Sequence, residues 1–107
     1  MVDESIALTI RRYLRAVQSA GIHARRAVLF GSYARGEADE WSDLDLVVIA
    51  PELENPAARD VVDKLWELRA TTDARIEPFP CGDREWETDR TRPILEIARR
   101  EGIVIAV

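Results

Sequence analysis

Apolar residues recur along this chain with two spacings, one typical of helices and one typical of strands. Over residues 3–20 they fall at steps of three and four, which predicts an amphipathic helix. A second helical stripe covers residues 55–70 and begins with Asn55-Pro56, a favourable cap followed by a proline suited to the first turn. A third predicted helix spans residues 91–101.

Short apolar runs predict four strands, two before and two after the second helix. The clearest run is Leu46-Val47-Val48-Ile49, which follows two acids and precedes a proline. A helical turn and a loop fill the connection between the first two strands, which is too short for the crossover helix that parallel strands need. We therefore expect those two strands to pair antiparallel. The predicted strands are 27–30, 43–50, 72–79 and 103–107, with the helical turn at 32–35 and loops at 36–41 and 80–83.

This order of elements indicates an α/β (α+β) fold, with a small mixed sheet of about four strands and helices packed on it. A length of 107 residues suits one domain, so we expect residues 1–107 to form a single unit. The acidic N-terminus is unlike a secretory leader, and no apolar run is long enough for a membrane helix, so we expect a cytoplasmic protein without membrane contact. The net charge of −5 argues against direct binding of nucleic acid.

Two acids open the second predicted strand and suggest a metal site. Strand side chains alternate, so Asp43 and Asp45 point to one face while Leu44 points to the other, toward the core. Two neighbouring carboxylates repel each other unless water or a cation offsets their charge. Hard oxygen ligands of this kind suit Mg²⁺, which is commonly shared with substrate phosphates.

A second feature, at the end of the first predicted strand, suits phosphate. Gly31 lets a phosphate approach the backbone, and Ser32 offers a hydroxyl and free N–H groups if it starts a helical turn. Arg35 lies one turn on and offers further positive charge, with a surface role as the alternative.

The two features together resemble the signature of the minimal nucleotidyltransferases, a family within the polymerase β superfamily. The matching residues are Gly31-Ser32-Tyr33-Ala34-Arg35-Gly36 and, after a gap, Ser42-Asp43-Leu44-Asp45-Leu46. The resemblance implies a polymerase-β-like core that transfers a nucleoside monophosphate, AMP from ATP, with the help of two Mg²⁺ ions.

The resemblance also implies roles for individual residues. Asp43 and Asp45 would bind both metal ions, while Gly31, Ser32 and Arg35 would hold the β- and γ-phosphates. A third carboxylate, usually Asp, comes from a later strand, where this chain offers Glu77 as a metal ligand that also helps to take the acceptor's proton; Asp73 is the fallback.

A chain of this length leaves no segment for an acceptor-binding domain, so we expect either that a partner chain shares the acceptor site or that the acceptor is itself a protein. Members of the minimal family are commonly paired with a HEPN ribonuclease toxin. The resemblance implies an antitoxin that adds AMP to a tyrosine of that partner. Two alternatives stay open: a non-catalytic antitoxin or scaffold that acts by contact, and a small-molecule nucleotidyltransferase.

The tryptophans offer no clear chemistry in the sequence. Trp41, just before the first acid, suits stacking on a base or, more simply, packing in the loop or core. Trp66 lies in a helical stripe and is expected in the core, whereas Trp86 lies in a polar stretch and is expected to be exposed for a partner. Cys81 is expected in a loop and is given no role.

Overall fold

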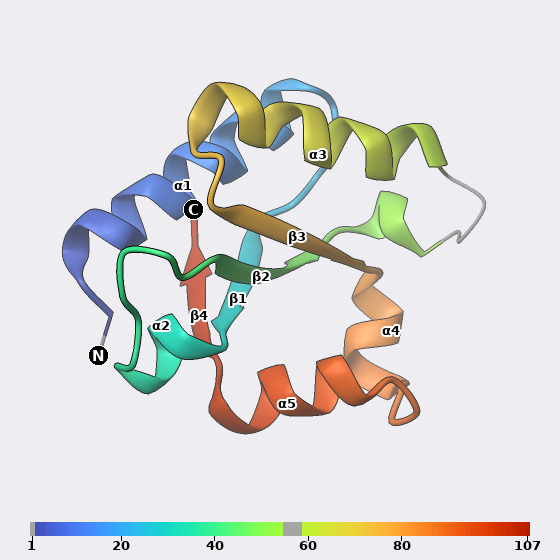
Figure 1. The fold of residues 1–107 in the computed structure, drawn as a ribbon. Helices are drawn as coiled ribbons and strands as arrows, with labels where there is room; N and C mark the ends of the chain where they lie inside the picture. The colour runs from blue at the N-terminus through green and yellow to red at the C-terminus, as the bar shows by residue number, and fades with distance from the viewer. Residues whose placement is uncertain (1, 55–58) are drawn as a thin grey trace.

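Four strands form one mixed sheet in the order β3-β2-β1-β4 (Figure 1). The structure, a computed structural model, describes residues 2–54 and 59–107. Strand β1 runs antiparallel to β2 and to β4, whereas β3 runs parallel to β2. The mixed sheet and the antiparallel pairing of the first two strands are thus confirmed. The strands span Arg26–Phe30 (β1), Leu44–Ile49 (β2), Ile76–Cys81 (β3) and Ile103–Ala106 (β4).

Helices cover both faces of this sheet (Figure 1). Helices α1 and α3 lie on one face, and α4 and α5 lie on the other, while the short α2 sits at the end of β1. The described helices are α1 (Glu4–Ser19), α2 (Ser32–Arg35), α3 (Arg59–Thr72), α4 (Asp83–Thr88) and α5 (Pro93–Glu101), with a 3-10 turn η1 at Pro51–Leu53. The expected start of the third helix at Asn55-Pro56 lies outside the described residues.

Alternation along β2 explains why the sheet has two apolar faces. Leu44 and Leu46 pack into the core cluster beneath α1 and α3, and Val47 and Ile49 pack into the cluster beneath α5. A buried hydrogen bond from the Tyr13 hydroxyl to the Leu65 carbonyl, 2.7 Å long, ties α1 to α3. Within the described parts of the chain, no helix combines the length and the apolar character needed to cross a membrane.

The region around β3 differs from the sequence prediction. The strand was expected over 72–79, but α3 continues to Thr72 and β3 runs from Ile76 to Cys81. It therefore takes in part of the predicted loop at 80–83, and Cys81 is buried at its end. Two prolines within the strand hid it, and they are tolerated because β3 is an edge strand. The rest of that loop begins α4, an additional helix whose polar sequence carries no apolar stripe.

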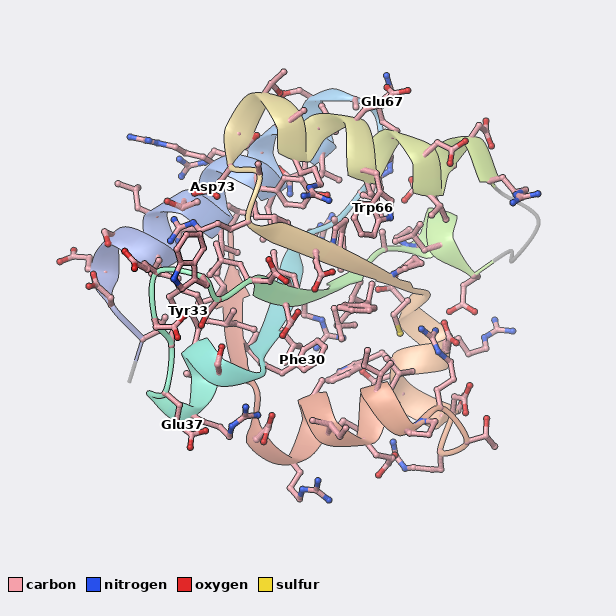
Figure 2. All side chains as sticks on the ribbon, in the orientation of Figure 1. Phe30, Tyr33, Glu37, Trp66, Glu67 and Asp73 are labelled. Atoms are coloured by element: carbon pink, nitrogen blue, oxygen red, sulfur yellow. The ribbon has the colours of Figure 1, made fainter. Side chains whose placement is uncertain are left out.

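Two tryptophan predictions are also wrong. Trp66 was expected in the core but is 39% exposed on α3, with the Arg69 guanidinium 5.0 Å from its ring centroid (Figure 2). Trp86 was expected to be exposed, but it packs against the apolar cluster beneath α5, with the Arg99 guanidinium over its ring at 4.8 Å.

Candidate active site

The sheet register brings two of the predicted acids side by side. Asp45 pairs with Phe30 across the antiparallel ladder and with Glu77 across the parallel one. Directly opposed residues on neighbouring strands project to the same face, so Asp45 and Glu77 are neighbours on the face that α5 covers. Asp43 lies two residues before Asp45, immediately preceding the first residue of β2, and is exposed. One end of the sheet therefore carries all three acids.

The carboxyl of Asp45 is hard to ionise at this position. Burial raises its pKa from 3.8 to about 7, together with a hydrogen bond to Glu77 and the negative charges of Glu77 and Asp43. The positive charge of Arg35 acts in the opposite direction but is the weakest influence. A carboxyl in this state needs a compensating cation to be fully ionised at neutral pH.

The turn after β1 lies directly against that carboxyl. Gly31 has φ of 79°, a region that disfavours residues with a side chain, and a Cβ at this position would overlap Oδ2 of Asp45. Ser32 then begins α2, with no side chain capping the start of the helix. The first N–H groups of a helix have no partner within it, so they are available to an anion. Sequence reasoning placed the glycine turn and the acids on neighbouring strands, and the structure puts them in contact.

Arg35 is held by two carboxylates. Its Nε donates to Glu37 at 2.5 Å and its Nη1 donates to Glu101 at 3.0 Å. The same Glu101 oxygen accepts the backbone N–H of Gly31 at 3.2 Å. Hydrogen bonding to Glu37 is the main reason that the pKa of Arg35 is raised above its ordinary value, so this side chain stays charged.

Glu101 is the residue that the sequence analysis missed. It is the last residue of α5, and one of its carboxylate oxygens, Oε1, accepts hydrogen bonds from both Gly31 and Arg35, two of the residues predicted to hold phosphate. The only signal in the sequence is its position, because an acid at the C-terminal end of a helix is unfavourable next to the helix dipole. An incoming phosphate oxygen that takes both donors has to replace this carboxylate.

Asp73 does not join the other acids. It lies before β3, and its carboxylate accepts three hydrogen bonds from the Arg75 side chain and a fourth from the Arg75 backbone. The hydrogen bonds from the Arg75 side chain lower the pKa of Asp73. Arg75 also donates to the Tyr33 hydroxyl at 3.0 Å, which joins the start of β3 to α2 (Figure 2). The pair thus supports the site's framework and leaves Glu77 as the third acid.

The three acids at this end of the sheet offer oxygen ligands for a metal ion. In residues 2–54 and 59–107, no three acidic, histidine or cysteine side chains already converge on one point. The oxygens of Asp43, Asp45 and Glu77 nevertheless fit Mg²⁺ by type. Burial, the hydrogen bond to Glu77 and the charges of Glu77 and Asp43 all raise the pKa of Asp45, and a bound cation would favour its ionised form.

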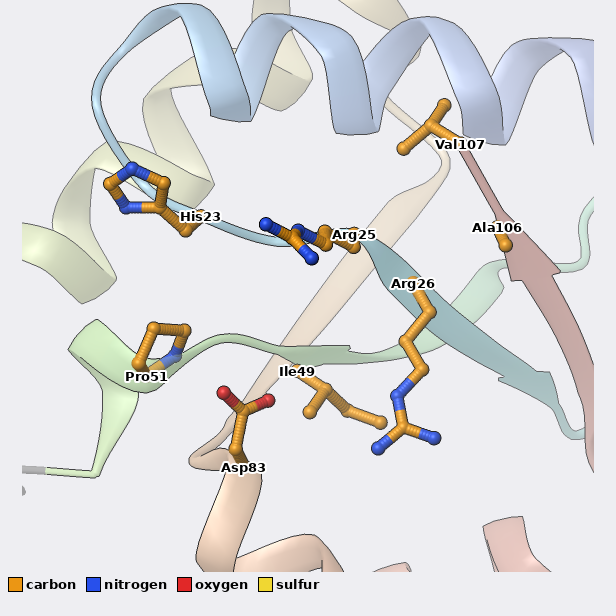
Figure 3. A pocket seen from close by; sticks show the side chains of 8 residues that line it. All are labelled: His23, Arg25, Arg26, Ile49, Pro51, Asp83, Ala106 and Val107. Carbon is orange, nitrogen blue, oxygen red and sulfur yellow. The ribbon is translucent and has the colours of Figure 1, made fainter.

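A separate cavity of about 600 Å³ lies at the opposite end of the sheet (Figure 3). It opens beside the start of β1 and the end of β2, with Arg25, Arg26 and His23 at its rim. Arg26 is paired with Glu87, and His23 with Glu52. Among the described residues that line it, Asp83 is the one acid, so they do not include the carboxylate arrangement described above.

Known proteins resemble this chain in sequence and in fold. The family described as nucleotidyltransferase domain matches residues 10–95. A proposed protein adenylyltransferase of Methanocaldococcus jannaschii is 54% identical over 28 residues, which are 26% of this chain and 28% of that protein's length. A crystal structure of a proposed nucleotidyltransferase from Sulfolobus solfataricus shares the fold, with a TM-score of 0.57 and 14% identity over 92% of this chain and 77% of that one.

Proposed function

This chain belongs to the nucleotidyltransferase domain family, and we propose that it transfers AMP from ATP to a hydroxyl group of a protein. The observation that carries this proposal is the contact between the Gly31 turn and the carboxyl of Asp45. A phosphate-binding turn and a metal-binding acid have to meet if one substrate, a metal-bound nucleotide, is to touch both.

Different residues of this chain bind the phosphates and accept the proton. Gly31, Ser32 and Arg35 hold the β- and γ-phosphates, which become the leaving pyrophosphate. The acceptor oxygen attacks the α-phosphorus, the bond from that phosphorus to the pyrophosphate oxygen breaks, and AMP stays on the acceptor. Glu77, beside Asp45 on the same face, accepts the proton that the hydroxyl loses.

Asp43, Asp45 and Glu77 are the residues that would hold Mg²⁺. When bound, two such ions supply charge stabilisation at the attacking and leaving oxygens. The setting of Asp45 supports this assignment, because burial and the neighbouring acids raise the pKa of a group that the chemistry needs ionised.

The proposed acceptor is a tyrosine of a partner HEPN ribonuclease toxin, which makes this chain an antitoxin. The resemblance of the Gly31 to Leu46 segment to the minimal nucleotidyltransferases supports this assignment. The 28-residue match, at 54% identity, to a proposed protein adenylyltransferase supports a protein acceptor.

The test is incubation with Mg²⁺, ATP and a HEPN-type protein encoded beside this chain, followed by intact mass measurement. ATP labelled at the α-phosphate should transfer its label to the partner, whereas ATP labelled at the γ-phosphate should not. The double variant Asp43→Ala, Asp45→Ala should lose transfer, and Asp63→Asn, an exposed acid on α3, should retain it.

Two results would contradict the proposal. Unmodified partner whose toxicity is still neutralised would favour an antitoxin that acts by contact alone. Transfer of label to a small hydroxylated compound, with none to protein, would favour the small-molecule reaction.

A further inference from the structure

Trp41 is the most exposed large apolar side chain in the described parts of the molecule. It is 84% exposed, against 58% for Val104, the next in that set. The sequence analysis favoured packing in the loop or core, and that expectation is wrong. A tryptophan left this open to water contributes nothing to the core, and its indole is available for contact with a partner.

The loop holds Trp41 outward in a defined turn. Oδ1 of Asp39 accepts the Trp41 backbone N–H at 2.9 Å and the Ser42 hydroxyl at 3.2 Å. The Ser42 hydroxyl oxygen in turn accepts the Asp39 N–H at 2.9 Å. The indole is therefore presented from an ordered backbone, two residues before Asp43. An anchor ordered in advance loses less entropy on binding.

The charge around the indole argues against a nucleic acid strand there. Two exposed acids, Asp39 and Glu40, directly precede Trp41, and the exposed Asp43 follows two residues later, while Glu37 is paired with Arg35. A strand of nucleic acid is repelled by such a loop, whereas a cationic segment is attracted. Exposed tryptophans that become buried on binding are characteristic hot spots of protein interfaces.

We propose that Trp41 anchors the acceptor, and that the acceptor hydroxyl lies in a basic segment of a partner protein. This inference rests on the proposed function, because it assigns the acceptor side of the same site. The indole buries apolar side chains of the segment, and the acids around it pair with the segment's Arg or Lys residues.

The experiment uses two labelled synthetic peptides that carry one tyrosine, flanked by arginines in one and by glutamates in the other. Binding is measured by fluorescence anisotropy, and AMP transfer is measured in parallel. Wild type should bind the arginine peptide at least about 10-fold more tightly than the glutamate peptide. Trp41→Ala should lower the affinity for the arginine peptide by about 10- to 30-fold, while the affinity for MgATP stays within about twofold of wild type. Trp66→Ala, which removes an exposed tryptophan of α3, is the matched control and should change neither affinity.

The outcomes separate this inference from the proposed function. The assignment of Trp41 as the acceptor anchor is overturned if wild type binds the two peptides equally. It is also overturned if Trp41→Ala lowers the affinity for MgATP and not the affinity for the peptide. Selective peptide binding that depends on Trp41, with no AMP incorporated into any peptide or partner, supports the anchor and refutes the transfer reaction. Glu40→Gln should reduce the salt dependence of arginine-peptide binding, and an unchanged salt dependence would contradict the charge argument.

Discussion

Replacing Asp45 with asparagine should make the metal-free protein more stable at pH 8. Folding partly buries this carboxyl and holds it beside Glu77 and Asp43, and its pKa rises from 3.8 to about 7. The folded chain therefore keeps a proton between those pH values that the unfolded chain has lost. The free energy of unfolding falls as the pH rises through this window and is level above it. Asparagine cannot ionise, so the variant avoids that loss.

The size of the effect follows from the same pKa change. A rise from 3.8 to about 7 corresponds to about 4 kcal/mol at 1.36 kcal/mol per pKa unit. Water reaches this half-buried carboxyl, so we expect a measured gain of about 1–2 kcal/mol at pH 8. In urea that gain moves the unfolding midpoint by about 0.5–1 M.

The assay is urea unfolding in the presence of a chelator, at pH 8 and at pH 5.5. The advantage of Asp45→Asn should be largest at pH 8 and roughly halve at pH 5.5, because the contribution shrinks toward zero near pH 4. Adding Mg²⁺ at pH 8 should stabilise wild type and leave the variant unchanged. Asp63→Asn removes an exposed acid of α3 and should show none of these effects.

Two results would refute this reasoning. One is a variant no more stable than wild type at pH 8, which would mean that neither burial nor the neighbouring carboxylates oppose the ionisation of Asp45 in the folded state. The other is an equal gain at both pH values, which would trace the effect to packing instead of ionisation.

Three further predictions concern the turn, its acidic partner and the thiol. Glu101→Gln keeps a hydrogen-bond acceptor but removes a negative charge that competes with phosphate. Calorimetry should therefore show MgATP binding about 2- to 5-fold tighter. Unchanged or weaker binding would contradict the idea that phosphate displaces the Glu101 carboxylate. Gly31→Ala should lower the free energy of unfolding by about 1–2 kcal/mol and abolish AMP transfer, because the added Cβ meets the carboxyl of Asp45. Gly36→Ala is the control, since Gly36 has a similar φ but open space around it, and this variant should lose stability while keeping AMP transfer. Burial raises the pKa of Cys81 to about 12, so a thiol reagent at pH 8 should label it only after denaturation, and fast labelling of the folded protein would contradict its burial.

The sequence predicted the strands that carry the site because each follows a simple rule. Apolar runs with a clear end marked β1 and β2, and the short connection between them predicted their antiparallel pairing. Alternation along the strand also put Asp43 and Asp45 on the same side. The prediction was weaker at β3, where two prolines suggest a break unless the strand is known to lie at an edge.

Contacts between distant parts of the chain were beyond the reach of such rules. Glu101 touches Gly31 and Arg35 across a separation of 66 to 70 residues, and no local pattern encodes that meeting. The exposure of Trp41 was missed for a related reason, since hydrophobicity alone favours burial. Only the turn made by Asp39 and Ser42 shows that the side chain is held outward.

The sheet order has a consequence for how the sheet forms during synthesis. Strand β1 is central, yet one of its two neighbours, β4, consists of residues that are made after all the other strands of the sheet. Until those residues leave the ribosome, one edge of β1 has no partner and Gly31 lacks its contact with Glu101. Pairing over such a long sequence distance is slow compared with local helix formation. The acids and the glycine turn are therefore synthesised long before the contacts that fix their final arrangement can form.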